Sequence, residues 1–204
     1  MLAKKKAESE EENQIFADYH RTMSTLLQHN FVLPFDHWIN SMGFTSRNQA
    51  HGSPGNLLDI YAAADIPEAE FFGSKPFDIP GYRVDPEYDS TTFGIPDIRA
   101  LKLASSAANL TGKKLVSAET ATWLGNHFKV SIAQVKPVLD QVFVGGVNHV
   151  FFHGATYSPP EVAWPGWLFY ASTNFNPQSH FWEALPELNR YVEHCQKMLQ
   201  AHPT

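Results

Sequence analysis

The sequence predicts an α/β protein built on a parallel sheet. Segments with helical periodicity alternate with short apolar segments along the 204 residues, which is the pattern of βαβ units. Each of the four expected strands ends in polar side chains, as strands do at the catalytic end of (β/α)8 barrels. A complete barrel has eight strands and about 250 residues. Four strands therefore indicate about half of a TIM (β/α)8 barrel.

The first half of the chain is expected to contain two strands and the helices around them. Ile15, Tyr19, Met23 and Leu26 recur at the spacing of one helical face. The expected elements, in order, are a helix over 10–30, its continuation over 35–42 after a break at Pro34, a strand within 44–52, a helix over 56–63 and a strand over 66–73.

The second half follows the same alternation after a Pro, Gly and Asp rich loop over 74–95. Ser131 and Gln134 match a capping box, and Pro137 is expected to kink the helix that follows. The expected elements are a helix over 97–110 ending near Gly112, a strand over 113–119, the helix after Ser131, a strand over 147–154 and a helix over 185–199.

Composition limits the classes of partner and compartment. The net charge is −6 without a basic stripe, which disfavours nucleic acid, and no apolar run reaches the about 18 residues of a membrane span. Cys195 is the only cysteine, so no internal disulfide forms, and its helical context predicts a buried apolar role. Residues 1–13 form a charged tail without a secretory signal, and localisation stays open.

Acidic side chains dominate the polar residues at the expected strand ends. Glu68 and Glu70 come from one strand and Glu119 from the next, and neighbouring strands lie about 4.8 Å apart. Two carboxyl groups several ångströms apart are what glycoside hydrolysis requires. The alternative is that these glutamates form salt bridges or cap helices. Repulsion between Glu68 and Glu70, which share a face, would raise one pKa and suit a general acid.

Polar and histidine side chains accompany the carboxylates. A donor cluster of Arg47, Asn48, Gln49 and His51 suits sugar hydroxyls, although a capped turn before Gly52 would look similar. His153 ends an apolar strand, either as a core residue or as part of the site. His149 and His153 would lie about 13 Å apart on a strand, too far to share a metal ion. Spacing identifies no metal ligands.

Aromatic residues follow the expected strand ends. Trp123, Tyr157 and Trp164 lie in loops on the presumed active face, where indole and phenol rings stack on sugars, or else anchor the loops.

Three long runs resemble glycoside hydrolase family 106, the α-L-rhamnosidases. They are RNQAHGSPGNLLDIYAAADIPEAEFFG, ASSAANLTGKKLVSAETATWL and GVNHVFFHGATYSPPEVAWPGWLFYAS, within a similarity over about 14–200. The resemblance implies that residues 14–204 are part of a (β/α)8 catalytic domain that hydrolyses terminal α-L-rhamnosides with inversion, with a calcium ion near the sugar. Family members are longer than this chain and are often periplasmic or extracellular.

The resemblance also implies roles for individual residues. Glu68 or Glu70 would be the general acid and Glu119 the general base, with the assignment of acid and base left open. Asn48, Gln49, His51 and His153 would line the sugar site. The partner would be a rhamnose-containing glycan or glycoside. Since strands of the family barrel are absent from this chain, we expect exposed sheet edges and self-association. The alternative function is a non-catalytic remnant or sugar-binding fragment.

Overall fold

Four parallel strands form the centre of the molecule. A computed structural model describes residues 9–74, 80–81, 89, 94–124, 127–171 and 173–201. The strands lie in the order β1-β2-β3-β4, and all neighbours are parallel. Their bounds are β1 Arg47–Gln49, β2 Ile66–Phe72, β3 Ser117–Thr122 and β4 His149–Phe152. The predicted α/β class with a parallel sheet is confirmed.

Helices connect successive strands, as βαβ units require. They are α3 (Leu57–Ala63) after β1, α5 (Ile98–Thr111) after β2 and α6 (Ile132–Val144) after β3. Gly112 ends α5 in the left-handed conformation, as the sequence predicts. The predicted loop over 74–95 lies mostly outside the described residues.

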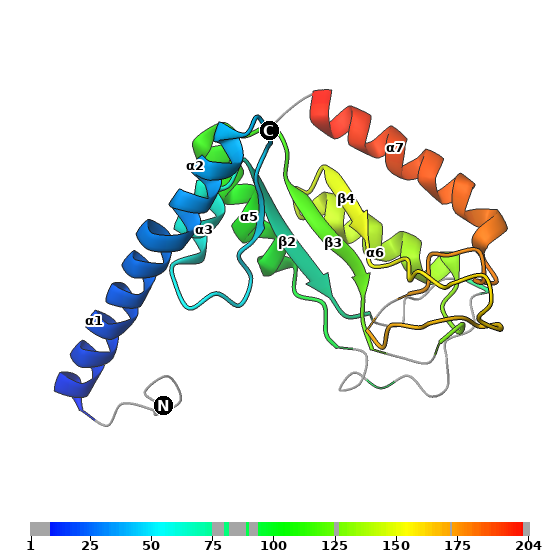
Figure 1. Cartoon of the computed structure of the whole chain (residues 1–204), viewed down its shortest axis with the longest axis horizontal. Helices are drawn as coiled ribbons and strands as arrows, with labels where there is room; N and C mark the ends of the chain where they lie inside the picture. The colour runs from blue at the N-terminus through cyan, green and yellow to red at the C-terminus, as the bar shows by residue number, and fades with distance from the viewer. Residues whose placement is uncertain are drawn as a thin grey trace.

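The N-terminal helical segment is longer and less interrupted than predicted. It consists of α1 (Glu10–Leu27), the π-helical turn η2 (Gln28–Val32) and α2 (Leu33–Ser41). No break occurs at Pro34 because this residue lies in the first turn of α2, where proline is tolerated. None of the residues of α1 is buried, and Figure 1 shows this helix extending away from the sheet.

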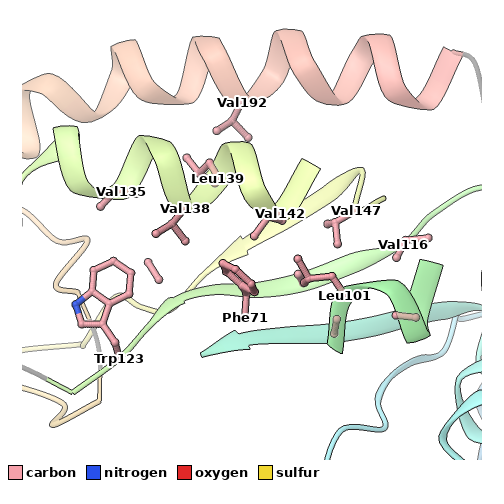
Figure 2. Packing of buried hydrophobic residues seen from close by; sticks show 14 of the residues in the cluster. Phe71, Leu101, Val116, Trp123, Val135, Val138, Leu139, Val142, Val147 and Val192 are labelled. Carbon is pink, nitrogen blue, oxygen red and sulfur yellow. The ribbon is translucent and has the colours of Figure 1, made fainter. Parts of the chain in front are cut away.

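The hydrophobic core lies on one face of the sheet. Ala69 and Phe71 of β2 and Ala118 of β3 are fully buried on that face. Figure 2 shows α6 placing Val135, Val138, Leu139 and Val142 above them, while Val192 of α7 (Leu185–Ala201) points at α6 from the outside. Burying each such aliphatic side chain stabilises the fold by about 1.5–3 kcal/mol. The core therefore holds the strands on a helical layer and leaves the opposite face for other groups.

Three local predictions were wrong. β3 begins at Ser117 rather than at 113, because the Asn148 side chain bonds the preceding segment: its Oδ1 accepts from the Val116 N–H at 2.9 Å and its Nδ2 donates to the Lys114 carbonyl at 2.8 Å. Ser131 makes no capping hydrogen bond at the start of α6. Cys195 is only half-buried. Pro137 lies within α6, and the expected kink there stays a prediction.

The described residues give neither sheet edge, the outer edge of β1 or that of β4, a further strand. Part of the β4 edge is covered by α7: the Val150 N–H donates to Gln196 Oε1 at 2.6 Å, and Gln200 Nε2 donates to the Asn148 carbonyl at 2.7 Å. Several large apolar side chains of η2, α2 and the segment before β1 are exposed, including Phe31, Trp38 and Phe44. No helix within the described ranges has the length and apolar character needed to cross a bilayer.

Candidate active site

The polar face of the sheet carries the predicted carboxylates. Side chains alternate between the two faces of a strand, so Glu68 and Glu70 lie opposite to the buried Ala69 and Phe71. The register then aligns three strands: Gln49 is the partner of Glu68, Glu68 of Ser117, and Glu70 of Glu119. The predicted convergence of acidic groups on one side of the sheet is therefore observed, within the strands rather than beyond their ends.

Glu70 faces Glu119 directly across the β2–β3 ladder. Burial raises the pKa of the Glu70 carboxyl above its usual value, and the charge of Glu119 raises it further. His51 and His153 act on the Glu70 pKa in the opposite direction, which places both imidazoles near this carboxyl group. A carboxyl group that keeps its proton at higher pH is suited to donating it to a leaving oxygen.

Glu68 is a buried carboxylate that the chain already satisfies. Its Oε2 accepts a hydrogen bond from Ser117 Oγ at 2.8 Å and lies 3.2 Å from Arg47 Nε. Burial raises the pKa of Glu68, while the Ser117 hydroxyl and the Arg47 guanidinium counteract that shift. Arg47 also lies over the Phe151 ring, 3.8 Å from its centre. These contacts fix the position of the Glu68 carboxyl group on the polar face of the sheet.

Glu119 is held by donors on both carboxylate oxygens. Gln49 Nε2 donates to Oε2 at 3.3 Å, and Thr122 Oγ1 donates to Oε1 at 2.9 Å. His153 Nε2 approaches the same Oε1 at 3.8 Å. The carboxylate remains one-quarter exposed, so it is fixed in position yet accessible to a water molecule.

A β-bulge at Ala121 makes the Thr122 contact possible. Phe71 pairs with Thr120 and Phe72 with Thr122, so Ala121 is the extra residue on β3. Its φ of 66° is in the left-handed region, which an L-residue adopts at a cost. In a regular strand, positions 119 and 122 would point to opposite faces; the additional residue returns Thr122 to the face of Glu119.

Two functional side chains were missed at the sequence level. Ser117 and Thr122 were not predicted to bind the carboxylates, although SAETAT places them within three residues of Glu119. For Ser117 the signal was the even spacing to Glu119, which puts both on one face of a strand. For Thr122 no such signal existed, because the bulge is visible only in the pairing.

Some predicted substrate-binding residues lie elsewhere. Trp123 is buried in the core cluster with Val135 and Val138, so its predicted stacking on a sugar is wrong (Figure 2). Asn48 points to the other face of β1 than Gln49 and borders a cavity of about 200 Å³ lined by Phe31 and Phe35.

The predicted aromatic residues of the loop after β4 are solvent-facing. Tyr157 and Trp164 are 74% and 70% exposed, and no described contact joins either of them to the carboxylates. Trp164 instead packs on Phe128, with ring centres 5.4 Å apart. Their binding role stays a prediction.

The acidic groups do not form a ready-made metal site. The described part of the chain contains no cluster of three His, Cys, Asp or Glu side chains placed to hold an ion. Oxygens of Glu68 and Glu119 already accept hydrogen bonds from Ser117, Gln49 and Thr122. Calcium therefore stays a prediction of the family resemblance.

A model of the α-L-rhamnosidase family, Glyco_hydro_106, matches residues 3–203. The chain belongs to this family. The resemblance in the three long sequence runs is thereby confirmed, and with it the relation to glycoside hydrolases.

Two known proteins are similar to this chain. A rhamnosidase from Novosphingobium sp. PP1Y has a similar structure, with a TM-score of 0.66 over 93% of this chain at 22% identity. A Formosa agariphila protein that carries the provisional name beta-glucuronidase is 28% identical over 184 residues, 90% of this chain. The chain spans 17% of the former and 14% of the latter. The likeness to the rhamnosidase supports a shared fold and is consistent with a segment of a barrel.

Proposed function

We propose that this chain supplies the two catalytic carboxyl groups of an enzyme that hydrolyses terminal α-L-rhamnosides with inversion. The observation that supports the proposal most strongly is the pairing of Glu70 with Glu119 on the accessible face of the sheet. Side chains on register partners begin about 4.8 Å apart. Glutamates that diverge from such positions can reach the carboxyl separation of about 6.5–9.5 Å that inversion requires.

In the proposed mechanism Glu70 is the general acid and Glu119 the general base. Glu70 protonates the glycosidic oxygen as the bond from that oxygen to the anomeric carbon breaks. Glu119 takes a proton from the water that attacks the anomeric carbon from the other side. We assign the acid role to Glu70 rather than to Glu68 because Arg47 and Ser117 already bind the Glu68 carboxylate. The role of Glu68 is to hold Arg47 and Ser117 beneath the reacting groups.

The charges on this face favour a neutral sugar over a uronic acid. The Glu119 carboxylate repels a second carboxylate, while Glu70 carries its proton in the proposed mechanism and the guanidinium of Arg47 is already paired with Glu68. Rhamnose has no carboxylate, whereas a glucuronide would bring one into this acidic region. We therefore favour the rhamnoside substrate over the glucuronide that the name of the Formosa protein suggests.

Product analysis on the intact protein tests the proposal. It is incubated with 4-nitrophenyl α-L-rhamnoside and, separately, with 4-nitrophenyl β-glucuronide, while NMR follows the first sugar anomer released. We expect hydrolysis of the rhamnoside alone and β-L-rhamnose as the first product. Hydrolysis of the glucuronide alone would rule out a rhamnoside as the substrate. Release of α-L-rhamnose as the first product would rule out inversion.

A non-catalytic sugar-binding fragment is the second candidate. It is favoured by the small share of each relative that the chain spans, 14% and 17%. Rhamnose binding by the 204-residue chain without turnover would support it. So would self-association in sedimentation through the edge of β1, which has no strand partner among the described residues.

A further inference from the structure

The side chain of Phe72 continues the row on β2 that carries the proposed acid. The extra residue of the bulge belongs to β3, so alternation along β2 is unbroken, and Glu70 and Phe72 lie on one face. The pairing agrees with this, because Phe72 is the register partner of Thr122, whose hydroxyl donates to Glu119 on that face. Figure 2 shows Phe71 pointing the other way, toward α6 in the core. The Phe72 ring therefore lies on the face where the two carboxyl groups meet.

The leaving group of the proposed reaction has to lie on the Glu70 side of the scissile bond. Glu70 protonates the glycosidic oxygen, whereas Glu119 acts from the neighbouring strand on the opposite side of the anomeric carbon. Active sites of parallel barrels open at the carboxyl ends of the strands, and β2 and β3 end side by side (Figure 1). A group attached to a terminal rhamnose would thus extend past Glu70 toward the end of β2. Phe72 lies in that direction, about 6.6 Å further along the strand.

Two glycines hold the Phe72 ring in place. A Cβ atom on Gly94 would lie 2.6 Å from Phe72 Cε1 and 2.8 Å from Cδ1, so the ring would have to move if this residue carried a side chain. Gly94 has a φ of 79° and Gly73 a φ of 105°, conformations that favour glycine. The Gly73 N–H donates to the Thr122 carbonyl at 2.8 Å and ties the end of β2 to β3. The ring is thus supported along one edge and remains partly exposed.

The neighbour of Glu70 on the other side offers no such surface. Glu68 precedes Glu70 on the same face of β2, and its carboxylate is bound by Ser117 and Arg47. Of the two side chains that flank the proposed acid along β2, only Phe72 is apolar, and it is the one at the open end of the site.

We infer that Phe72 forms one wall of a leaving-group subsite and contacts the ring attached to the rhamnose. This inference rests on the proposed rhamnosidase function. It adds a preference for leaving groups that carry a ring with an apolar face, either aromatic or sugar, because aromatic side chains pack well against flat apolar surfaces.

The intact protein and its Phe72→Leu variant are compared on benzyl and methyl α-L-rhamnoside. Benzyl alcohol and methanol have nearly equal acidity, so both substrates make the same demand on Glu70, and only one carries a ring. Leucine keeps an apolar side chain but removes the flat ring, and thermal unfolding checks that the variant folds. We expect the ratio of kcat/KM for the benzyl substrate to that for the methyl substrate to fall about 2- to 10-fold, the range of one aromatic pair.

Two further variants serve as controls. Phe72→Tyr retains the ring and should keep the wild-type ratio. Phe44→Leu makes the same substitution at a phenylalanine that is 66% exposed and precedes β1, at the amino end of the sheet, and should also keep the ratio.

A rhamnosyl glucose disaccharide as a third substrate separates the two types of ring. A loss relative to the methyl substrate that is confined to the benzyl rhamnoside assigns the subsite to aromatic groups, one confined to the disaccharide assigns it to sugars, and a loss on both assigns it to both. An equal change on all three substrates in Phe72→Leu, or no change on any, would overturn the subsite and leave the rhamnosidase proposal intact. Hydrolysis of none of the three by the wild type would overturn both.

Discussion

Glu70 and Glu119 are register partners on β2 and β3, so two carboxyl groups from separate strands face the same space. Their surroundings differ. Burial and the charge of Glu119 raise the pKa of Glu70, while Gln49 and Thr122 hold the oxygens of Glu119. This difference between two neighbouring carboxyl groups is the basis for assigning one as acid and one as base.

The raised pKa of Glu70 predicts a pH-dependent stability. Below its ordinary value of 4.5 the carboxyl group is protonated in both folded and unfolded chains. As the pH rises from 4.5 to the higher folded pKa, the unfolded chain ionises first, so the wild type loses stability, because burial opposes ionisation in the folded state. Glu70→Gln avoids this cost and is expected to be the more stable protein at neutral pH. The gain is about 1.4 kcal/mol for each tenfold difference in proton affinity between the two states.

Denaturant unfolding of wild type and Glu70→Gln from pH 4 to 8 measures that difference. The unfolding free energies of the two proteins should coincide near pH 4 and differ increasingly as the pH rises. The exposed Glu183 of η3 gives the matched control, Glu183→Gln, for which no separation is expected. If the stability of Glu70→Gln relative to wild type falls between pH 4 and neutral pH, the raised pKa of Glu70 is contradicted.

The acid role of Glu70 predicts a dependence on the leaving group. Glu70→Gln in the intact protein should lose about 10²- to 10⁴-fold in kcat/KM on methyl α-L-rhamnoside, which needs protonation of its leaving oxygen. The loss should nearly vanish on 2,4-dinitrophenyl α-L-rhamnoside, whose leaving group departs as an anion. Equal losses on both substrates would remove Glu70 from the acid position.

The pair between Arg47 and Glu68 predicts a structural effect. Arg47→Met leaves the buried Glu68 carboxylate with the hydrogen bond from the Ser117 hydroxyl and should cost about 1–3 kcal/mol in unfolding free energy at pH 7. Arg190→Met, which breaks an exposed pair with Glu187, should cost less than about 1 kcal/mol. Comparable losses in the two variants in urea unfolding would show that Glu68 is not held by Arg47.

The bulge at Ala121 predicts a specific role for Thr122. Thr122→Val keeps the shape of the buried side chain but removes the donor to Glu119 Oε1, so kcat should fall about tenfold or less. Thr111→Val removes a hydroxyl that donates to the Ala107 carbonyl in α5, at a distance from the site, and should leave kcat unchanged. Unchanged kcat in Thr122→Val would mean that Gln49 alone orients the carboxylate.

The sequence predicted the class of fold because local signals sufficed for it. Helical spacing around Ile15 and Tyr19 and apolar runs such as that before His153 depend on neighbours along the chain. The predicted start of a strand was wrong where a side chain distant in the sequence decides where the strand begins. Asn148, 34 residues away, bonds Lys114 and thereby delays the start of β3.

In the candidate site, too, local signals predicted some features and distant contacts decided others. Glu68, Glu70 and Glu119 were recognisable because alternation and parallel order put them on one side of the sheet. The contacts of Glu68 could not be predicted, because they depend on Arg47 and Ser117 from the two neighbouring strands. Trp123 was misjudged because nothing local showed that α6 would cover it.

Turnover by Glu119→Gln in the intact protein tests the central claim most directly, on both methyl and 2,4-dinitrophenyl α-L-rhamnoside, with Glu183→Gln as control. The account predicts that Glu119→Gln folds normally and loses about 10²- to 10⁴-fold in kcat on both substrates, because activating the water is needed whatever group leaves. Near-normal turnover by Glu119→Gln on either substrate would contradict it.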